Sequence, residues 1–231
     1  MKKILNTLQV NYFTNNNDVT ATPPILGMLL AKLSSLSLLP MFAHEVNALT
    51  GERRQIIIMT DADQNFRIEF PMQSIVFTGN NIEISDFFNK VESALEALKS
   101  IFPDKKSNRL AIVNSSFYRA DKEKYSELYK KMFTYHQVDP IEWENRIVER
   151  KNFGSSAEIA NMVSSARRCS VQHPFVDSGN LVDVINFEVD TNTIPENVNN
   201  RFDFTSSIPV LRELYNKNNE LIESFSRYAN V

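Results

Sequence analysis

The side chains that could act as nucleophiles or as soft metal ligands are few: one cysteine and three histidines. Cys169, His173 and Asp177 follow one another at four-residue intervals. A Cys–His–Asp nucleophilic set requires these side chains to converge in space, which spacing alone does not show. His44, His136 and His173 fall in different predicted elements, and none has a second ligand at i+2 or i+4. We interpret Cys169 as a buried structural thiol and predict no catalytic residue.

Two groups of acidic residues could hold Mg²⁺ or act as an acid–base pair. Asp61 and Asp63 flank a predicted turn, where aspartate is common. The second group is Asp183, Glu188 and Asp190 on a predicted strand; Glu188 and Asp190 share one face of it, and a solvated face explains these two. We predict no metal and no cofactor. A metal-dependent nuclease or nucleotide-processing effector that uses Asp61, Asp63 or Asp183 is the alternative function.

Common motifs for phosphate loops, dinucleotide binding, zinc or serine hydrolysis and paired cysteines are absent from the sequence. Its formal net charge of -3 gives no overall electrostatic signal for nucleic acid. Basic pairs occur at 53–54, 105–106, 130–131, 150–151 and 167–168, most of them diluted by nearby acidic residues. Ordinary surface charge explains them, so nucleic acid is a disfavoured partner and a nucleic-acid-binding subunit is a second alternative.

The elements that would position these residues repeat in order along two halves, 1–103 and 108–231. In the first half we predict a strand at 1–10, a helix from Pro23 to a stop at Pro40, strands at 54–60, 66–70 and 73–78, and a helix capped by Ser85. In the second half we predict a strand at 110–113, a helix capped by Asp121, strands at 142–149 and 182–190, and a final helix. That helix would be capped by Ser206 or Ser207, with Pro209 in its first turn. Segment 157–171 is ambiguous between helix and strand, and its neighbours favour strand.

The resulting fold class is α+β, with antiparallel sheets in meander order packed against amphipathic helices. Each half would have its own curved sheet shielded by a helix. Apolar residues make up 42% of the chain, which is ordinary for a globular protein. The meander and its helices would still expose some Phe and Leu side chains, which could form an oligomer interface or a groove for extended apolar peptides. Core packing is the simpler interpretation of the same residues. The candidate partner contacts are Leu29, Leu33, Leu36, Leu214, Leu221 and Phe225.

The single cysteine favours a reducing compartment, and we predict a cytoplasmic protein. The most apolar segment, 25–39, is too short for a membrane span, which needs about 20 residues. We therefore expect no membrane association.

A four-stranded antiparallel sheet followed by a long C-terminal helix resembles the export chaperone SecB and its relatives. The strand at 182–191 and the helix at 207–228 also look like the end of a sporadically distributed family of bacterial proteins of about this length. That family's pattern covers most of the chain from Leu39 onward, including the hairpins at 52–77, and it has no established catalytic residues. SecB-like proteins are often smaller, so a chain with two SecB-like halves would differ from that family's pattern. The oligomeric state of the family therefore does not carry over directly to this chain.

The resemblance to SecB implies binding of unfolded or partner polypeptides through apolar grooves. The leading hypothesis is a non-enzymatic protein-binding module, either a SecB-like chaperone or a partner subunit of a bacterial toxin–antitoxin or phage-defence system. We expect a homo-oligomer. The operon context follows from the resemblance alone.

Overall fold

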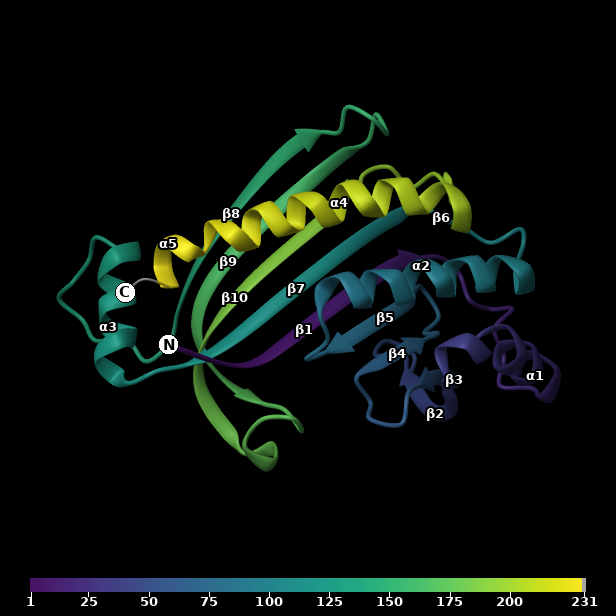
Figure 1. The fold of residues 1–231 in the computed structure, drawn as a ribbon, viewed down its shortest axis with the longest axis horizontal. Coiled ribbons are helices and arrows are strands. Elements are labelled where there is room, and N and C mark those ends of the chain that lie inside the picture. The colour runs from purple at the N-terminus through teal and green to yellow at the C-terminus, as the bar shows by residue number, and fades with distance from the viewer. Residues whose placement is uncertain (230–231) are drawn as a thin grey trace.

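The computed structural model describes residues 1–229, which form an α+β fold around one antiparallel sheet of nine strands (Figure 1). The strands of this sheet are β1 (Lys2–Phe13), β2 (Leu39–Val46), β3 (Arg53–Thr60), β4 (Phe66–Glu69), β5 (Ile75–Asn80), β7 (Arg109–Arg119), β8 (Trp143–Asn152), β9 (Ile159–Gln172) and β10 (Leu181–Thr193). Their order across the sheet is β2-β3-β4-β5-β1-β7-β10-β9-β8. Two short strands, β6 (Lys106–Ser107) and β11 (Phe202–Asp203), pair separately.

Two long helices, α2 (Ile84–Ile101) and α4 (Phe204–Ser224), lie side by side across one face of the sheet, which we call the helix-covered face (Figure 1). The opposite face is called the open face. The other helices are α1 (Pro23–Lys32), α3 (Lys122–Met132) and α5 (Ser226–Ala229), with single 3-10 turns at Ser34–Leu36 and Asp177–Gly179. Within residues 1–229, no helix is long and apolar enough to cross a membrane.

The two halves share this sheet through their first strands, β1 and β7. These strands pair antiparallel from Lys2 opposite Arg119 to Phe13 opposite Arg109, with an irregularity between Lys3 and Leu5. The expectation of a separate sheet for each half is therefore wrong, because the pairing of β1 with β7 joins them. The division into units 1–103 and 108–231 stays a prediction.

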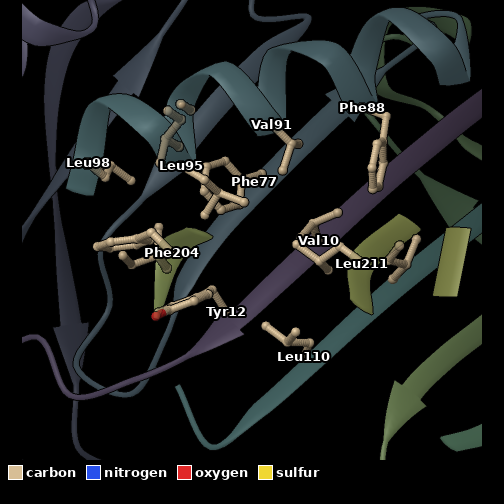
Figure 2. Close-up of a cluster of buried hydrophobic side chains, with 14 of the residues drawn as sticks. Val10, Tyr12, Phe77, Phe88, Val91, Leu95, Leu98, Leu110, Phe204 and Leu211 are labelled. Atoms are coloured by element: carbon tan, nitrogen blue, oxygen red, sulfur yellow. The ribbon is translucent and has the colours of Figure 1, made fainter. Parts of the chain in front are cut away.

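The main core fills the space between the helix-covered face and the two long helices (Figure 2). The apolar stripe of α2 contributes Val91 and Leu95, which meet Val10 of β1. Tyr12 of β1 is fully buried, stacks on Phe204 at a ring-centroid distance of 4.9 Å, and donates a hydrogen bond of 2.7 Å to the Phe202 carbonyl oxygen. The apolar face of β1, which alternates with a period of two, thus packs against the apolar stripe of α2, whose residues recur at three- and four-residue spacing as predicted from the sequence.

Most predicted elements are present, and the ambiguous segment 157–171 is a strand, β9. Asp121 caps α3 by accepting a hydrogen bond of 2.8 Å from the Lys124 N–H. The predicted helix at 23–39 is too long, because α1 ends at Lys32. A 3-10 turn follows it, and Ser37 adopts a left-handed φ of 53° that no helix continues. Leu39 consequently begins strand β2 instead of ending a helix.

Both long helices begin earlier than predicted. Asp203 caps α4, and Ser206, one of the two predicted caps, instead closes a reciprocal capping box with it. Pro209 therefore lies in the second turn rather than the first. Helix α2 begins at Ile84, before the predicted cap Ser85, and the residue at its cap position, Glu83, makes no side-chain capping hydrogen bond.

Candidate functional site

The two edges of the sheet, β2 and β8, differ in the side chains that they expose. Strand β2 has the sequence LPMFAHEV, and its exposed apolar side chains are Leu39 (59%), Met41 (47%), Phe42 (48%) and Val46 (54%). An edge strand also presents backbone N–H and C=O groups that pair with no neighbouring strand. We call these four side chains and the free backbone of β2 the β2 edge.

Pairing with β3 distributes the apolar side chains of the β2 edge over both faces of the sheet. Phe42 lies opposite Ile57, which is fully buried in the core under the helices. Met41 lies opposite Ile58, whose side chain belongs to the open face. An added strand could therefore bury apolar side chains on either face.

Charge does little to block the β2 edge. Its one acidic residue, Glu45, is only partly exposed, and its carboxylate accepts a hydrogen bond of 2.8 Å from the Met72 N–H. Pro40 has no backbone N–H, so β2 has one hydrogen-bond donor fewer, and within sheets proline is found mainly on edge strands. The sequence does not predict the start of this strand, because the leucine-rich run before it continues a helical pattern. Pro40 itself was a signal for an edge strand.

Strand β8, at the other edge, carries five charged residues in ten positions: Glu144, Arg146, Glu149, Arg150 and Lys151. It also exposes two apolar side chains, Ile147 (50%) and Val148 (49%). Charged side chains along an edge oppose pairing with another strand. Both edges thus expose two adjacent apolar side chains to a similar extent, but β8 carries many charged side chains and β2 carries few.

The six predicted partner contacts lie in or against the core. Leu29, Leu33, Leu214 and Phe225 are each at most 7% exposed, and Leu36 and Leu221 are partly buried against the same clusters. Their role as contacts stays a prediction, but they stabilise the fold of the described chain. Neighbours on α1 are more accessible, because Met28 and Leu30 are each 41% exposed.

The acidic residues of the alternative function do not converge: Asp61 and Asp183 have structural partners, and Asp63 is exposed in the turn between β3 and β4. Asp61 closes the β3–β4 turn, where its carboxylate accepts hydrogen bonds from the N–H groups of Asn65 and Phe66 at 2.8 and 3.1 Å. Asp183 pairs with Arg168 at 2.8 Å. Among residues 1–229, no three His, Cys, Asp or Glu side chains gather closely enough to hold a metal ion.

Asp190 and Glu188 lie on the open face, but this part of the face is less solvated than expected. Burial raises the pKa of the Asp190 carboxyl, and the side-chain amide of Asn192 opposes this by donating a hydrogen bond of 2.9 Å. Glu188 accepts a hydrogen bond of 2.8 Å from the Ser115 hydroxyl. The neighbouring polar residues Asn186 and Asn192 on the same strand face are also buried, so the strand's alternation predicts their face but not their burial.

The remaining reactive candidates do not form a catalytic set. Burial raises the pKa of the half-buried Cys169 thiol, which disfavours the reactive thiolate, and burial lowers the pKa of the His173 imidazole. Asp177 pairs with Arg119 at 3.4 Å. Of the basic pairs, Lys105, Arg150, Lys151, Arg167 and Arg168 each have a carboxylate within 4.0 Å.

Comparison with models of protein families finds none that matches this chain, and comparison with curated proteins finds no similar sequence. The candidate site therefore rests on the geometry of the described residues.

Proposed function

We propose that the chain is a protein-binding module that takes an extended, apolar polypeptide segment along the β2 edge by strand addition. The observation that carries this proposal is the contrast between the two sheet edges, of which only β2 combines apolar exposure with little charge. Backbone hydrogen bonds would give affinity independent of sequence, and the side chains on both faces would favour apolar segments. A module of this kind could act as a chaperone that binds unfolded chains or as a subunit that binds one specific partner.

The size of the expected contribution follows from the exposed fractions. Full burial of a leucine, methionine, phenylalanine or valine side chain contributes about 1.5–3 kcal/mol. When a partner buries the exposed half of such a side chain, the binding free energy therefore gains about 1 kcal/mol. Met41 and Phe42, at 47% and 48% exposed, would together contribute about 2 kcal/mol. Their loss would weaken binding about 30-fold.

The double variant Met41→Lys/Phe42→Lys tests the β2 edge, and Ile147→Lys/Val148→Lys on β8 is its control. The control changes two adjacent strand positions of nearly equal exposure and adds the same charge. The probe is a reduced, carboxymethylated polypeptide that stays unfolded in native buffer. Fluorescence anisotropy measures its binding, and light scattering measures protection of a denatured client from aggregation.

We expect the wild type and the β8 variant to bind the probe and protect the client, and the β2 variant to lose both activities. Failure of the wild type to bind or protect, or equal loss in both variants, would overturn the proposal. Light scattering after size-exclusion chromatography gives the oligomeric state. A wild-type dimer that only the β2 variant disrupts, with no probe binding, would assign this edge to a second copy of the chain.

A further inference from the structure

The helix-covered face changes from apolar to polar along the central strands β1 and β7. At one end of this pair, Val10 and Tyr12 of β1 meet Leu110 and Ile112 of β7, all at most 2% exposed. The other end carries polar side chains that belong to the same face by strand alternation: Asn6 of β1, and Asn114 and Ser116 of β7. The last two are 4% exposed, so the fold places polar groups where further apolar core would be expected.

These polar residues form the floor of a pocket of about 340 Å³. Its walls are the start of α2 with the loop before it, and the later turns of α4, which continues along the strands past the beginning of α2 (Figure 1). The wall and rim residues are Lys3, Asn81, Ile82, Glu83, Ile84, Asn219 and Ile222. The volume lies within the range of pockets that hold small molecules.

The floor contains an amide group without a protein partner. The Oδ1 atom of Asn114 is buried and has no hydrogen-bond partner among residues 1–229. Leaving such a group unpaired costs stability. By contrast, the Ser116 hydroxyl donates a hydrogen bond of 2.8 Å to Asn6 Oδ1, which holds the adjacent part of the floor in place.

The start of α2 supplies a second, independent feature. Helix α2 has eighteen residues, and Glu83 at its cap position makes no side-chain capping hydrogen bond. The first N–H groups of a helix have no intrahelical acceptor, and with the helix dipole they favour a negatively charged group. Ile82, Glu83 and Ile84 line the pocket, so this helix start borders the same space as Asn114.

Charge at the rim has both signs. Lys3 is one of the residues that line the pocket, and its Nζ lies 6.0 Å from the centre of the neighbouring Tyr118 ring. The carboxylates of Glu83 and Asp86 belong to the same helix start, but both residues are exposed and their side chains can remain in solvent. The interior of the pocket is otherwise neutral and rich in amide groups.

We propose that this pocket binds a small phosphate monoester that also carries hydroxyl groups. The phosphate oxygens accept hydrogen bonds from the N–H groups at the start of α2 and from Lys3, and a hydroxyl of the ligand forms a hydrogen bond with the side-chain amide of Asn114, which lines the pocket. The pocket lies on the helix-covered face near the middle of the sheet and shares no residue with the β2 edge. The inference therefore stands apart from the proposed function.

The probes are ribose 5-phosphate, inorganic phosphate and ribose, added to the full chain. Isothermal titration measures affinity, and amide chemical shifts of Ile84, Ser85 and Asp86 locate the binding. We expect ribose 5-phosphate to bind more tightly than phosphate, and ribose not to bind. Asn114→Leu should weaken binding of the ester about fivefold or more, because it removes a hydrogen-bond partner.

Two charge variants distinguish this pocket from general attraction of an anion. Lys3→Met should weaken binding, whereas Lys2→Met, which removes the same charge one residue away, should not. Glu83→Gln should strengthen binding about two- to fivefold, because it removes a negative charge from a helix start. The proposal is overturned by absent amide shifts at millimolar ribose 5-phosphate, by equal effects of the two lysine variants, or by unchanged binding in Asn114→Leu.

Discussion

Two buried asparagines allow the cost of an unpaired amide to be measured inside one fold. Asn114 and Asn192 are 4% and 3% exposed, on strands β7 and β10. Asn192 donates a hydrogen bond of 2.9 Å to the Asp190 carboxylate and accepts one of 3.1 Å from Arg109. Asn114 Oδ1 accepts none from residues 1–229. Replacement of each by leucine should therefore change stability in opposite directions.

The magnitudes follow from these contacts. An unpaired buried polar group costs about 1–3 kcal/mol, so Asn114→Leu should raise the free energy of unfolding by about that amount. A hydrogen bond to a charged group contributes about 1.5–3 kcal/mol. Asn192→Leu removes two such bonds, together with a longer one of 3.4 Å that Asn192 accepts from the Asn161 amide. Because Asp190 and Arg109 keep partial access to water, the lower value applies to each of the two charged bonds. The expected loss is about 3 kcal/mol.

Guanidinium unfolding followed by circular dichroism measures both variants against the wild type in phosphate-free buffer. A lower unfolding midpoint for Asn114→Leu would refute the reasoning, because it would show that the Asn114 amide is satisfied in the folded protein. A gain in stability together with lost ligand binding would mark Asn114 as a residue kept for function.

Two further substitutions test the open face and the packing beside α2. Since burial raises the pKa of Asp190 in the folded state, stability should fall as pH rises from its ordinary value through the raised one, and Asp190→Asn should stabilise the protein more at pH 7 than at pH 4 in urea unfolding. An equal gain at both values would contradict this. Gly79→Ala would place a Cβ 2.6 Å from Phe87 Cδ2 and should cost about 1–3 kcal/mol, whereas Gly154→Ala, with no atom within 4 Å, should be neutral in the same assay.

The periodic parts of the fold could be predicted from the sequence because their signals are local. Alternation identifies β10, and the apolar stripe identifies α2, since both are read from neighbouring residues. The pairing of β1 with β7 depends on residues about a hundred positions apart, so nothing local distinguishes one shared sheet from two. The start of β2 was missed because Leu38 and Leu39 extend the leucine-rich pattern of the preceding helix.

The candidate sites were harder to predict because they depend on what the fold leaves uncovered. Met41 and Phe42 look like core residues in the sequence, and only their place on an edge strand leaves them half exposed. The pocket gathers residues from four separate segments of the chain. A weak local signal exists, since Asn6 precedes Leu8 and Val10 on one strand face, and Asn114 follows Ile112 on the neighbouring one. Only the strand register shows that these polar residues of β1 and β7 lie close together in the sheet.

The arrangement of the two halves gives a reason for the pocket's position. In the first half the chain runs from the central strand β1 through α1 to the edge strand β2, returns to β5 beside β1, and continues into α2. In the second half it runs from β7 through α3 to the edge strand β8, returns to β10 beside β7, and continues into α4. Because β1 and β7 are antiparallel, α2 and α4 run in opposite directions along the central pair: α4 begins over the end that contains Tyr12, and α2 begins nearer the middle, above Asn6 and Asn114 (Figure 1). The two helix starts are therefore equivalent in the order of elements, although they lie at different positions along the central pair.

At the start of α4, the chain itself supplies the negative group. The N–H groups of Ser206 and Thr205 hold the pKa of the Asp203 carboxyl below its ordinary value, and Phe204 closes the space by stacking on Tyr12. The equivalent start of α2 lacks such a cap, and polar Asn114 lies in its floor where α4 meets apolar residues. A variant that supplies the missing cap, Glu83→Asp, should therefore compete with phosphate: its stability should rise and its affinity for ribose 5-phosphate should fall. Unchanged affinity in a stabilised Glu83→Asp protein would show that the N–H groups of α2 are not the anion's donors.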